Sequence, residues 1–117
     1  MSMMTRISPS LKVHALPLRH LGLDDVAWSR EYTREVLNAI KDADIAVLGG
    51  DVFRERGGHL VHTYDNWHCE RDVAESLANY ARRSWQYAWD YVAKYPENKA
   101  EQVYFSLVTS DEPTAGL

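Results

Sequence analysis

The sequence predicts an α+β fold, in which two main helices pack on a mainly antiparallel sheet of four or five strands. Two segments repeat their apolar residues with the period of an amphipathic helix, and the other apolar runs are short and rich in β-branched or aromatic residues. Glycine pairs separate several of these runs, as expected where strands bend or turn. We expect a single domain over residues 1–117, because neither a repeat nor a linker divides this length.

The composition is that of an ordinary globular chain, with 45% hydrophobic and 26% charged residues. Its net charge of -4 argues against nucleic acid as a direct ligand and mildly favours a basic partner. One cysteine excludes an internal disulfide, and no apolar run approaches the roughly 18 residues of a membrane span. We therefore expect a cytoplasmic protein that spans no membrane, with frayed ends at residues 1–10 and 111–117.

The first helix is predicted over residues 30–43, with Ser29 as its N-cap. One side of this segment is apolar and the other is charged, which predicts a half-buried surface helix. The apolar positions are Tyr32, Val36, Ala39, Ile40 and Ala43.

The second helix is predicted over residues 73–95, between a capping-box pair, Asp72 and Glu75, and the helix-ending Pro96. Trp85 and Trp89 lie about 80° and 120° from the centre of its apolar stripe, outside the arc that a sheet would cover. Either a loop or the N-terminal segment covers them, or they form an exposed aromatic ridge for a partner. The stripe comprises Val73, Leu77, Tyr80, Ala81, Ser84, Ala88, Tyr91, Val92 and Tyr95.

Short apolar runs predict the strands. Four runs are clear and residues 12–16 are a candidate fifth; the four are residues 45–48, 51–53, 60–64 and 102–108. The Gly49-Gly50 pair predicts a bulge or tight bend between the first two runs.

The Gly57-Gly58 pair predicts a hairpin turn whose length decides the register. A two-residue turn places Phe53 opposite His62, whereas a three-residue loop places it opposite Val61. We favour the second pairing, because it matches two hydrophobic residues.

A cluster of potentially reactive side chains supports an alternative function. A small metal- or thiol-dependent enzyme would use Asp51, His62, His68 and Cys69. The spacing is poor for zinc, because His59 and His62 would point to opposite faces of a strand. A third alternative is a small-ligand binding module with the aromatic helix as one wall of its pocket.

Acidic residues concentrate in the segment that precedes the second helix. Residues 65–75 hold four acids and one arginine, and such a patch would attract a basic protein. The same acids also suit a helix N-terminus. Trp67, in the same segment, either plugs the end of the core or is displayed to a partner.

Three sequence elements occur in order: Gly49-Gly50-Asp51 after a hydrophobic run, then Tyr64-Asp65-Asn66-Trp67, then a long aromatic helix followed by a strand. Over roughly residues 26–109 this series resembles the immunity protein 40 family of bacterial polymorphic-toxin systems. The resemblance implies a cytoplasmic antidote that binds a secreted toxin domain and neutralises it, without catalytic residues, metal or cofactor. Such toxins are often nucleases with basic surfaces, which would suit the acidic segment.

We expect the toxin-binding residues in the acidic segment and on the edge of the long helix. The candidates are Asp65, Trp67, Glu70, Glu75, Trp85 and Trp89. The motif residues Gly49, Gly50, Asp51, Tyr64 and Asn66 would equally serve a bulge, a turn and a core plug. The identity of the toxin and the oligomeric state are left open.

Overall fold

The computed structural model describes residues 9–97 and 99–110. The helices are α1 (Pro9–Val13), the 3-10 helix η2 (Arg19–Leu21), α2 (Arg30–Asp42) and α3 (Leu77–Lys94). The strands are β1 (Leu16–Pro17), β2 (Val26–Ser29), β3 (Val47–Arg56), β4 (His59–His68) and β5 (Val103–Thr109). The expected fraying of residues 1–8 and 111–117 lies outside the described residues, whereas Pro9 and Ser10 begin α1.

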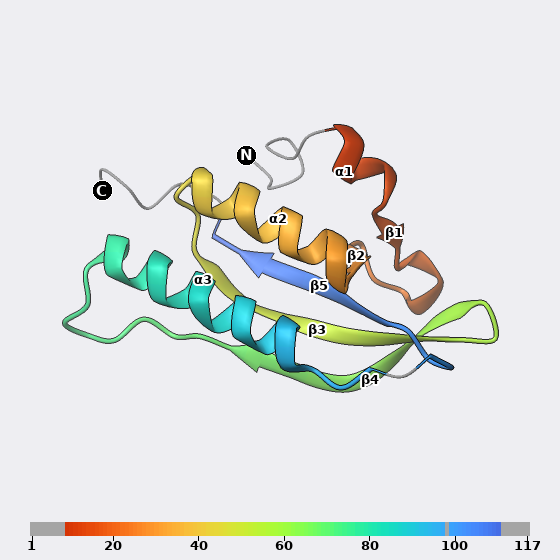
Figure 1. Cartoon of the computed structure of the whole chain (residues 1–117). Coiled ribbons are helices and arrows are strands. Elements are labelled where there is room, and N and C mark those ends of the chain that lie inside the picture. The colour runs from red at the N-terminus through yellow and green to blue at the C-terminus, as the bar shows by residue number, and fades with distance from the viewer. Residues whose placement is uncertain (1–8, 98, 111–117) are drawn as a thin grey trace.

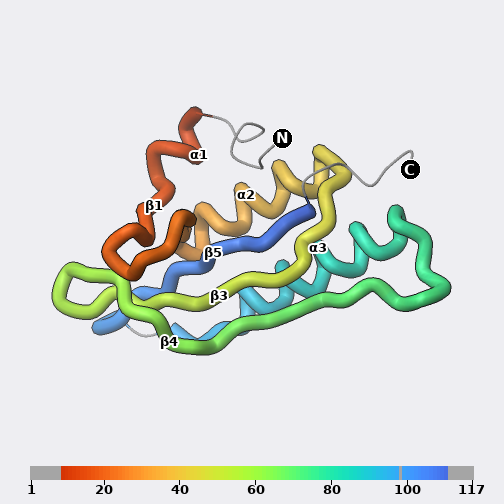
Figure 2. Tube along the Cα trace, turned by 180° about the vertical axis from the view of Figure 1, so that it is seen from behind, coloured from red at the N-terminus to blue at the C-terminus, as the bar shows by residue number. Residues whose placement is uncertain are grey.

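The strands form one sheet in the order β1-β2-β5-β3-β4, and each of these pairs is antiparallel. Helices α2 and α3 lie beside one another on one face of this sheet (Figure 1). Figure 2 shows the opposite face, which neither of these two helices covers. The α+β class and the antiparallel sheet predicted from the sequence are therefore confirmed.

The main core lies between the sheet and the two long helices. Alternate residues of β5 point into it, as the period of a strand requires. Its buried members include Trp28, Val36, Leu37, Ile40, Val52, Trp67, Val92, Val103, Phe105 and Leu107. A smaller cluster on the other face contains Leu18, Ala27, Phe53 and Leu60, so the segment before β2 covers part of that face.

Helix α2 begins where the sequence predicts. The Ser29 hydroxyl accepts a hydrogen bond from the Tyr32 N–H at 3.5 Å, which satisfies a backbone donor of the first turn. The helix ends at Asp42, one residue before the predicted boundary.

Helix α3 begins at Leu77, so the start predicted at Val73 is wrong. Its N-cap is Ser76, whose hydroxyl accepts from the Asn79 N–H at 3.2 Å. The expected capping-box contact does form, between the Asp72 N–H and the Glu75 carboxylate, but it closes a turn ahead of the helix.

The β3–β4 hairpin has the two-residue turn, so the favoured pairing of Phe53 with Val61 is wrong. Phe53 pairs with His62, and Arg56 pairs with His59 across the turn. Both Gly57 and Gly58 have positive φ, +60° and +84°, which is the backbone of a type I′ turn. The sequence-level preference for paired hydrophobes missed the ring contact that Phe53 makes with His62 at 4.8 Å.

Three strand predictions need adjustment. Residues 47–48 of the first run and the whole run 51–53 belong to one strand, β3, whereas Ile45 and Ala46 precede it. The expected bulge lies between Val47 and Gly49. The candidate strand 12–16 is wrong apart from Leu16, because α1 extends to Val13. Strand β2 was not predicted, because its four residues run directly into the N-cap of α2.

Candidate functional site

The first candidate, Trp67, lies in the core rather than on the surface. Its side chain is 3% exposed, and its ring stacks on Tyr91 with 4.6 Å between centroids. It also fills the space over Gly50, where a β-carbon would lie 2.3 Å from the indole Cη2. At Gly49 a β-carbon would lie 2.2 Å from the Trp67 carbonyl oxygen. Trp67 is therefore a core plug, and both motif glycines allow it to fit.

Strand β4 contains a large bulge next to Trp67, which we call the β4 bulge (Thr63–Asp65). These three residues oppose Val52 alone, because His62 pairs with Phe53 and Asn66 pairs with Asp51. The Thr63 hydroxyl donates to the Val52 carbonyl at 2.8 Å and accepts from the Asp65 N–H at 3.1 Å. The threonine thus replaces hydrogen bonds that the bulge removes from the ladder.

Tyr64 is displayed at the tip of the β4 bulge. Its φ is +68° and its side chain is 82% exposed. Its N–H donates to His62 Nδ1 at 2.7 Å, and the two rings stack 4.8 Å apart. A left-handed backbone costs an L-residue about 1–2 kcal/mol, and such strain is concentrated at functional sites. This part of the motif therefore forms a bulge within a strand, and the bulge presents Tyr64.

Asp65 connects the β4 bulge to the end of α3. The Tyr95 hydroxyl donates to Asp65 Oδ2 at 2.5 Å. Burial raises the pKa of Tyr95, and its bond to the Asp65 carboxylate raises it further. Two segments that are thirty residues apart in sequence therefore form one surface.

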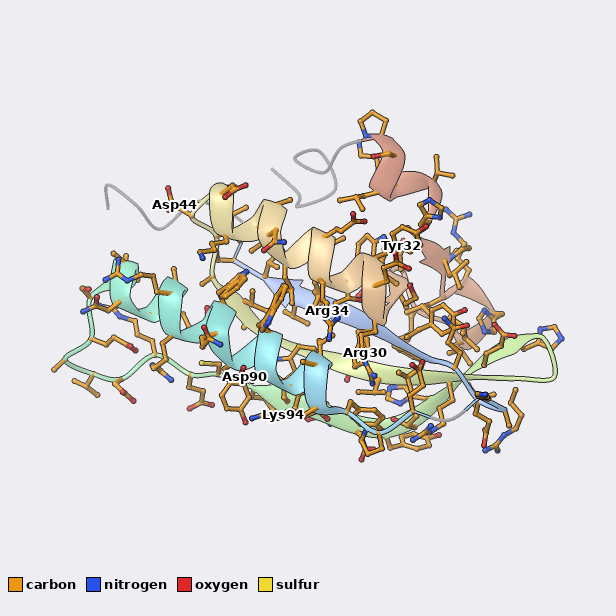
Figure 3. The ribbon with its side chains drawn as sticks, viewed as in Figure 1. Arg30, Tyr32, Arg34, Asp44, Asp90 and Lys94 are labelled. Atoms are coloured by element: carbon orange, nitrogen blue, oxygen red, sulfur yellow. The ribbon has the colours of Figure 1, made fainter. Side chains whose placement is uncertain are left out.

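A groove of about 420 Å³ continues this surface along α3. It is lined by Tyr87, Asp90, Tyr91, Lys94, Tyr95 and Pro96, and we call it the tyrosine groove. Figure 3 shows Asp90 and Lys94 on the flank of α3 that faces away from α2. Because Tyr91 rests on Trp67 and Tyr95 binds Asp65, the groove adjoins the β4 bulge. Together we call them the tyrosine surface.

The sequence offered a pocket walled by the aromatic helix as one alternative, but it did not predict that these tyrosines line a groove. Tyr91 and Tyr95 were expected in the apolar stripe of the helix, whereas both are partly exposed. A signal was present, because Tyr87, Tyr91 and Tyr95 follow each other at intervals of four residues with Asp90 and Lys94 between them. A purely structural stripe would carry fewer hydroxyl and charged groups.

The acidic segment is partly neutralised by α3. Arg83 forms an ion pair with Glu75 at 2.7 Å, and its guanidinium also donates to the Glu70 carbonyl and to Cys69 Sγ. The Arg83 guanidinium lowers the pKa of Glu75 to about 2. Glu70 and Asp72 are exposed, whereas the Glu75 side chain is only 11% exposed. Glu75 therefore holds the turn in place and is poorly placed to meet a partner.

Trp85 and Trp89 lie in the seam between α3 and α2, so they form no exposed ridge. The Trp85 indole donates to the Leu37 carbonyl at 2.6 Å, and the two indoles stack 5.1 Å apart. Lys41 lies over Trp85 and Arg34 over Trp89, both from α2. The covering element is thus α2, rather than the loop or N-terminal segment that the sequence suggested.

The four residues of the alternative enzyme do not meet at one site. His62 packs on the Phe53 ring, and Asp51 projects from the face opposite to the helices. Burial raises the pKa of the Cys69 thiol, whereas a nucleophilic cysteine needs a lowered pKa. Over residues 9–97 and 99–110, no group of three or more His, Cys, Asp or Glu side chains is arranged to hold a metal. Within the same ranges, no helix combines the length and the apolar character of a membrane span.

The sequence model of the family described as immunity protein 40 matches residues 17–109. No curated protein and no solved structure matches the chain. The matched span includes the Gly49-Gly50 pair, the β4 bulge and all of α3, and it begins earlier than the resemblance over residues 26–109. The chain therefore belongs to the immunity protein 40 family.

Proposed function

We propose that this immunity protein binds a cognate toxin domain through the tyrosine surface and neutralises it as a stoichiometric partner, without catalysis. The observation that carries the proposal is Tyr64, an exposed aromatic residue on a left-handed backbone, next to Asp65, whose carboxylate binds Tyr95 at the end of the groove. The bulge could relax if this position were glycine, so the strain supports a role that needs the tyrosine itself. Aromatic anchors of this kind supply much of the binding energy of protein interfaces.

The chemistry of the surface supports a protein partner with a basic face. Asp65 and Asp90 lie on the tyrosine surface, and Glu70 and Asp72 are exposed on the turn beyond β4. A secreted nuclease toxin would offer such a face, and the antidote would meet it in the cytoplasm of the producing cell. An interface of this kind usually buries about 800 Å² of surface on each partner.

The rings of the tyrosine surface are held before any partner arrives. Tyr91 is stacked on the buried Trp67, and Tyr95 is bonded to Asp65. Binding would therefore order few side chains, which lowers its entropic cost. Preorganisation of this kind suits an inhibitor that acts at low concentration.

The test begins with the gene immediately upstream, whose product should be a large secreted protein with a variable C-terminal domain. That domain is coexpressed with the immunity protein, and the affinity of the purified complex is measured by calorimetry. Tyr64→Ala should weaken binding about 30-fold and reduce protection of the cell. Val13→Ala is the matched control, because Val13 is 79% exposed on α1, and its affinity should equal that of the wild type.

Three outcomes would count against the proposal. Equal affinities for Tyr64→Ala and Val13→Ala would show that the toxin binds elsewhere. A toxin domain that forms no complex and stays lethal in the presence of this chain would exclude neutralisation. Turnover of a substrate that is lost on replacement of Cys69 or His68, with the fold intact, would show that the protein is an enzyme.

A further inference from the structure

We infer that the tyrosine groove receives a cationic side chain of the toxin, an arginine or a lysine. This inference rests on the proposed function and specifies the chemistry that the groove recognises.

Two of the three tyrosine rings that line the groove are held in place by contacts with the core. Tyr91 is stacked on Trp67, and Tyr95 meets the buried Phe105 edge to face, with 6.0 Å between centroids. A positive charge is attracted to the face of an aromatic ring, most strongly where water is partly excluded. The groove therefore offers a cation a site whose geometry exists in the free protein.

The groove supplies carboxylates that can pair with a cation. Asp90 is part of the lining and Asp65 lies at the adjoining bulge, and the cations beside them are Lys94 in the lining and Arg54 over the Tyr95 ring. Asp90 Oδ1 accepts a hydrogen bond from the Gln86 amide at 3.1 Å, which positions the carboxylate. Burial raises the pKa of Tyr91, and the charge of Asp65 raises it further, so Asp65 lies close to that ring.

The same fold already places cations over aromatic rings of α3 and of its C-cap residue. Lys41 lies 4.5 Å from the centroid of the Trp85 ring, and Arg54 lies 5.5 Å from that of Tyr95. Because Arg54 already lies over Tyr95, a toxin cation is expected to use Tyr87 and Tyr91. Tyr87 is 47% exposed and therefore accessible to it.

Lys94 allows the charge preference of the groove to be tested. Its ammonium lies in the same groove and opposes a second positive charge. Lys94→Ala should therefore tighten the toxin complex about threefold, and Asp90→Asn should weaken it by a similar factor. An anionic occupant would reverse both signs, and an apolar occupant would leave both affinities unchanged, so either result would overturn the inference.

A second experiment uses the immunity protein alone. Nα-acetyl-arginine amide is titrated into the isotopically labelled full chain, and backbone amide shifts are followed by NMR. We expect weak saturable binding that shifts the amides of Tyr87, Asp90 and Tyr91, with much weaker binding of the neutral citrulline analogue. Asp90→Asn should lower the affinity several-fold, while Asp42→Asn on α2 is the control that should leave it unchanged.

The two experiments separate this inference from the proposed function. If the arginine probe shifts no groove residue, or the citrulline analogue binds equally well, the cation site is wrong even when the toxin complex forms. If the probe binds the groove but no toxin complex forms, the proposed function is wrong while the cation site stands. Nα-acetyl-aspartate amide is titrated as the anionic probe, because binding of this anion in the groove would also overturn the inference.

Discussion

The indole of Trp67 lies over Gly50, its direct partner across the β3–β4 ladder, in the space that a β-carbon would fill. This contact lets a large ring lie flat against the sheet and support Tyr91 above it. Residues of two separate sequence motifs, the glycine pair and the Tyr-Asp-Asn-Trp segment, therefore form one structural unit. That unit underlies the tyrosine surface without being accessible to a partner.

Gly50→Ala should lower the free energy of unfolding by about 3 kcal/mol, because the new methyl group overpacks the core. It would lie 2.3 Å from Trp67 Cη2 and 2.4 Å from the Ser106 carbonyl oxygen. Urea denaturation measures the loss. Gly22→Ala is the control, since Gly22 has a φ of +77° but no atom within 4 Å of a new β-carbon. Its cost should be about 1 kcal/mol, and equal costs at both positions would contradict the steric explanation.

Tyr64→Gly should raise the free energy of unfolding by up to about 1 kcal/mol while weakening toxin binding. Glycine adopts the left-handed backbone of this position without strain, although it loses the stacking on His62. Chemical denaturation and calorimetry measure the two effects. Asn66→Gly, on the same strand but without a positive φ, should only destabilise. A loss of stability at Tyr64 as large as that at Asn66 would show that the bulge stores no relievable strain.

Ser84→Ala should lower the free energy of unfolding by about 1–3 kcal/mol, because it leaves a buried donor without its acceptor. The Ser84 hydroxyl is fully buried and accepts a hydrogen bond from the Val47 N–H at 2.9 Å, which attaches α3 to the start of β3. Hydrogen exchange of the Val47 amide should become faster in this variant. Ser29→Ala, which removes the N-cap of α2, should leave that exchange rate unchanged relative to global stability.

The Glu75–Arg83 pair should make stability depend on pH in the acid range. Because folding lowers the pKa of Glu75 from 4.5 to about 2, the pair stabilises the folded state above pH 4.5. That contribution is lost as the pH falls from 4.5 towards about 2, when the carboxylate becomes protonated. Urea unfolding at several pH values should show a smaller acid-induced loss for Glu75→Gln than for the wild type. Glu35→Gln, on the exposed side of α2, serves as the control. If stability depended on pH in the same way for Glu75→Gln and for the wild type, the role of the pair would be contradicted.

Local patterns predicted much of the fold but little of the site. The N-cap at Ser29 and the turn at Gly57-Gly58 depend on neighbouring residues, and both occur where they were predicted. The predicted start of α3 was wrong because residues 72–76 contain two alternative signals for a helix start, a capping-box pair and an N-cap serine. The hydrogen bonds of Arg83, eight residues after Glu75, hold that pair in a separate turn.

The sequence by itself determined the α+β class, the helix that begins at Arg30, the glycine bulge and turn, and the resemblance to the family, because these depend on residue type and spacing along the chain. Only the tertiary structure decided which side chains are exposed. Trp67 is buried and Tyr64 is displayed, although they are three residues apart, because a bulge and a glycine on the neighbouring strand set their directions. Trp85 and Trp89 are partly covered, because α2 lies against them. Exposure is a property of what packs against a residue, and that neighbour is usually distant in sequence.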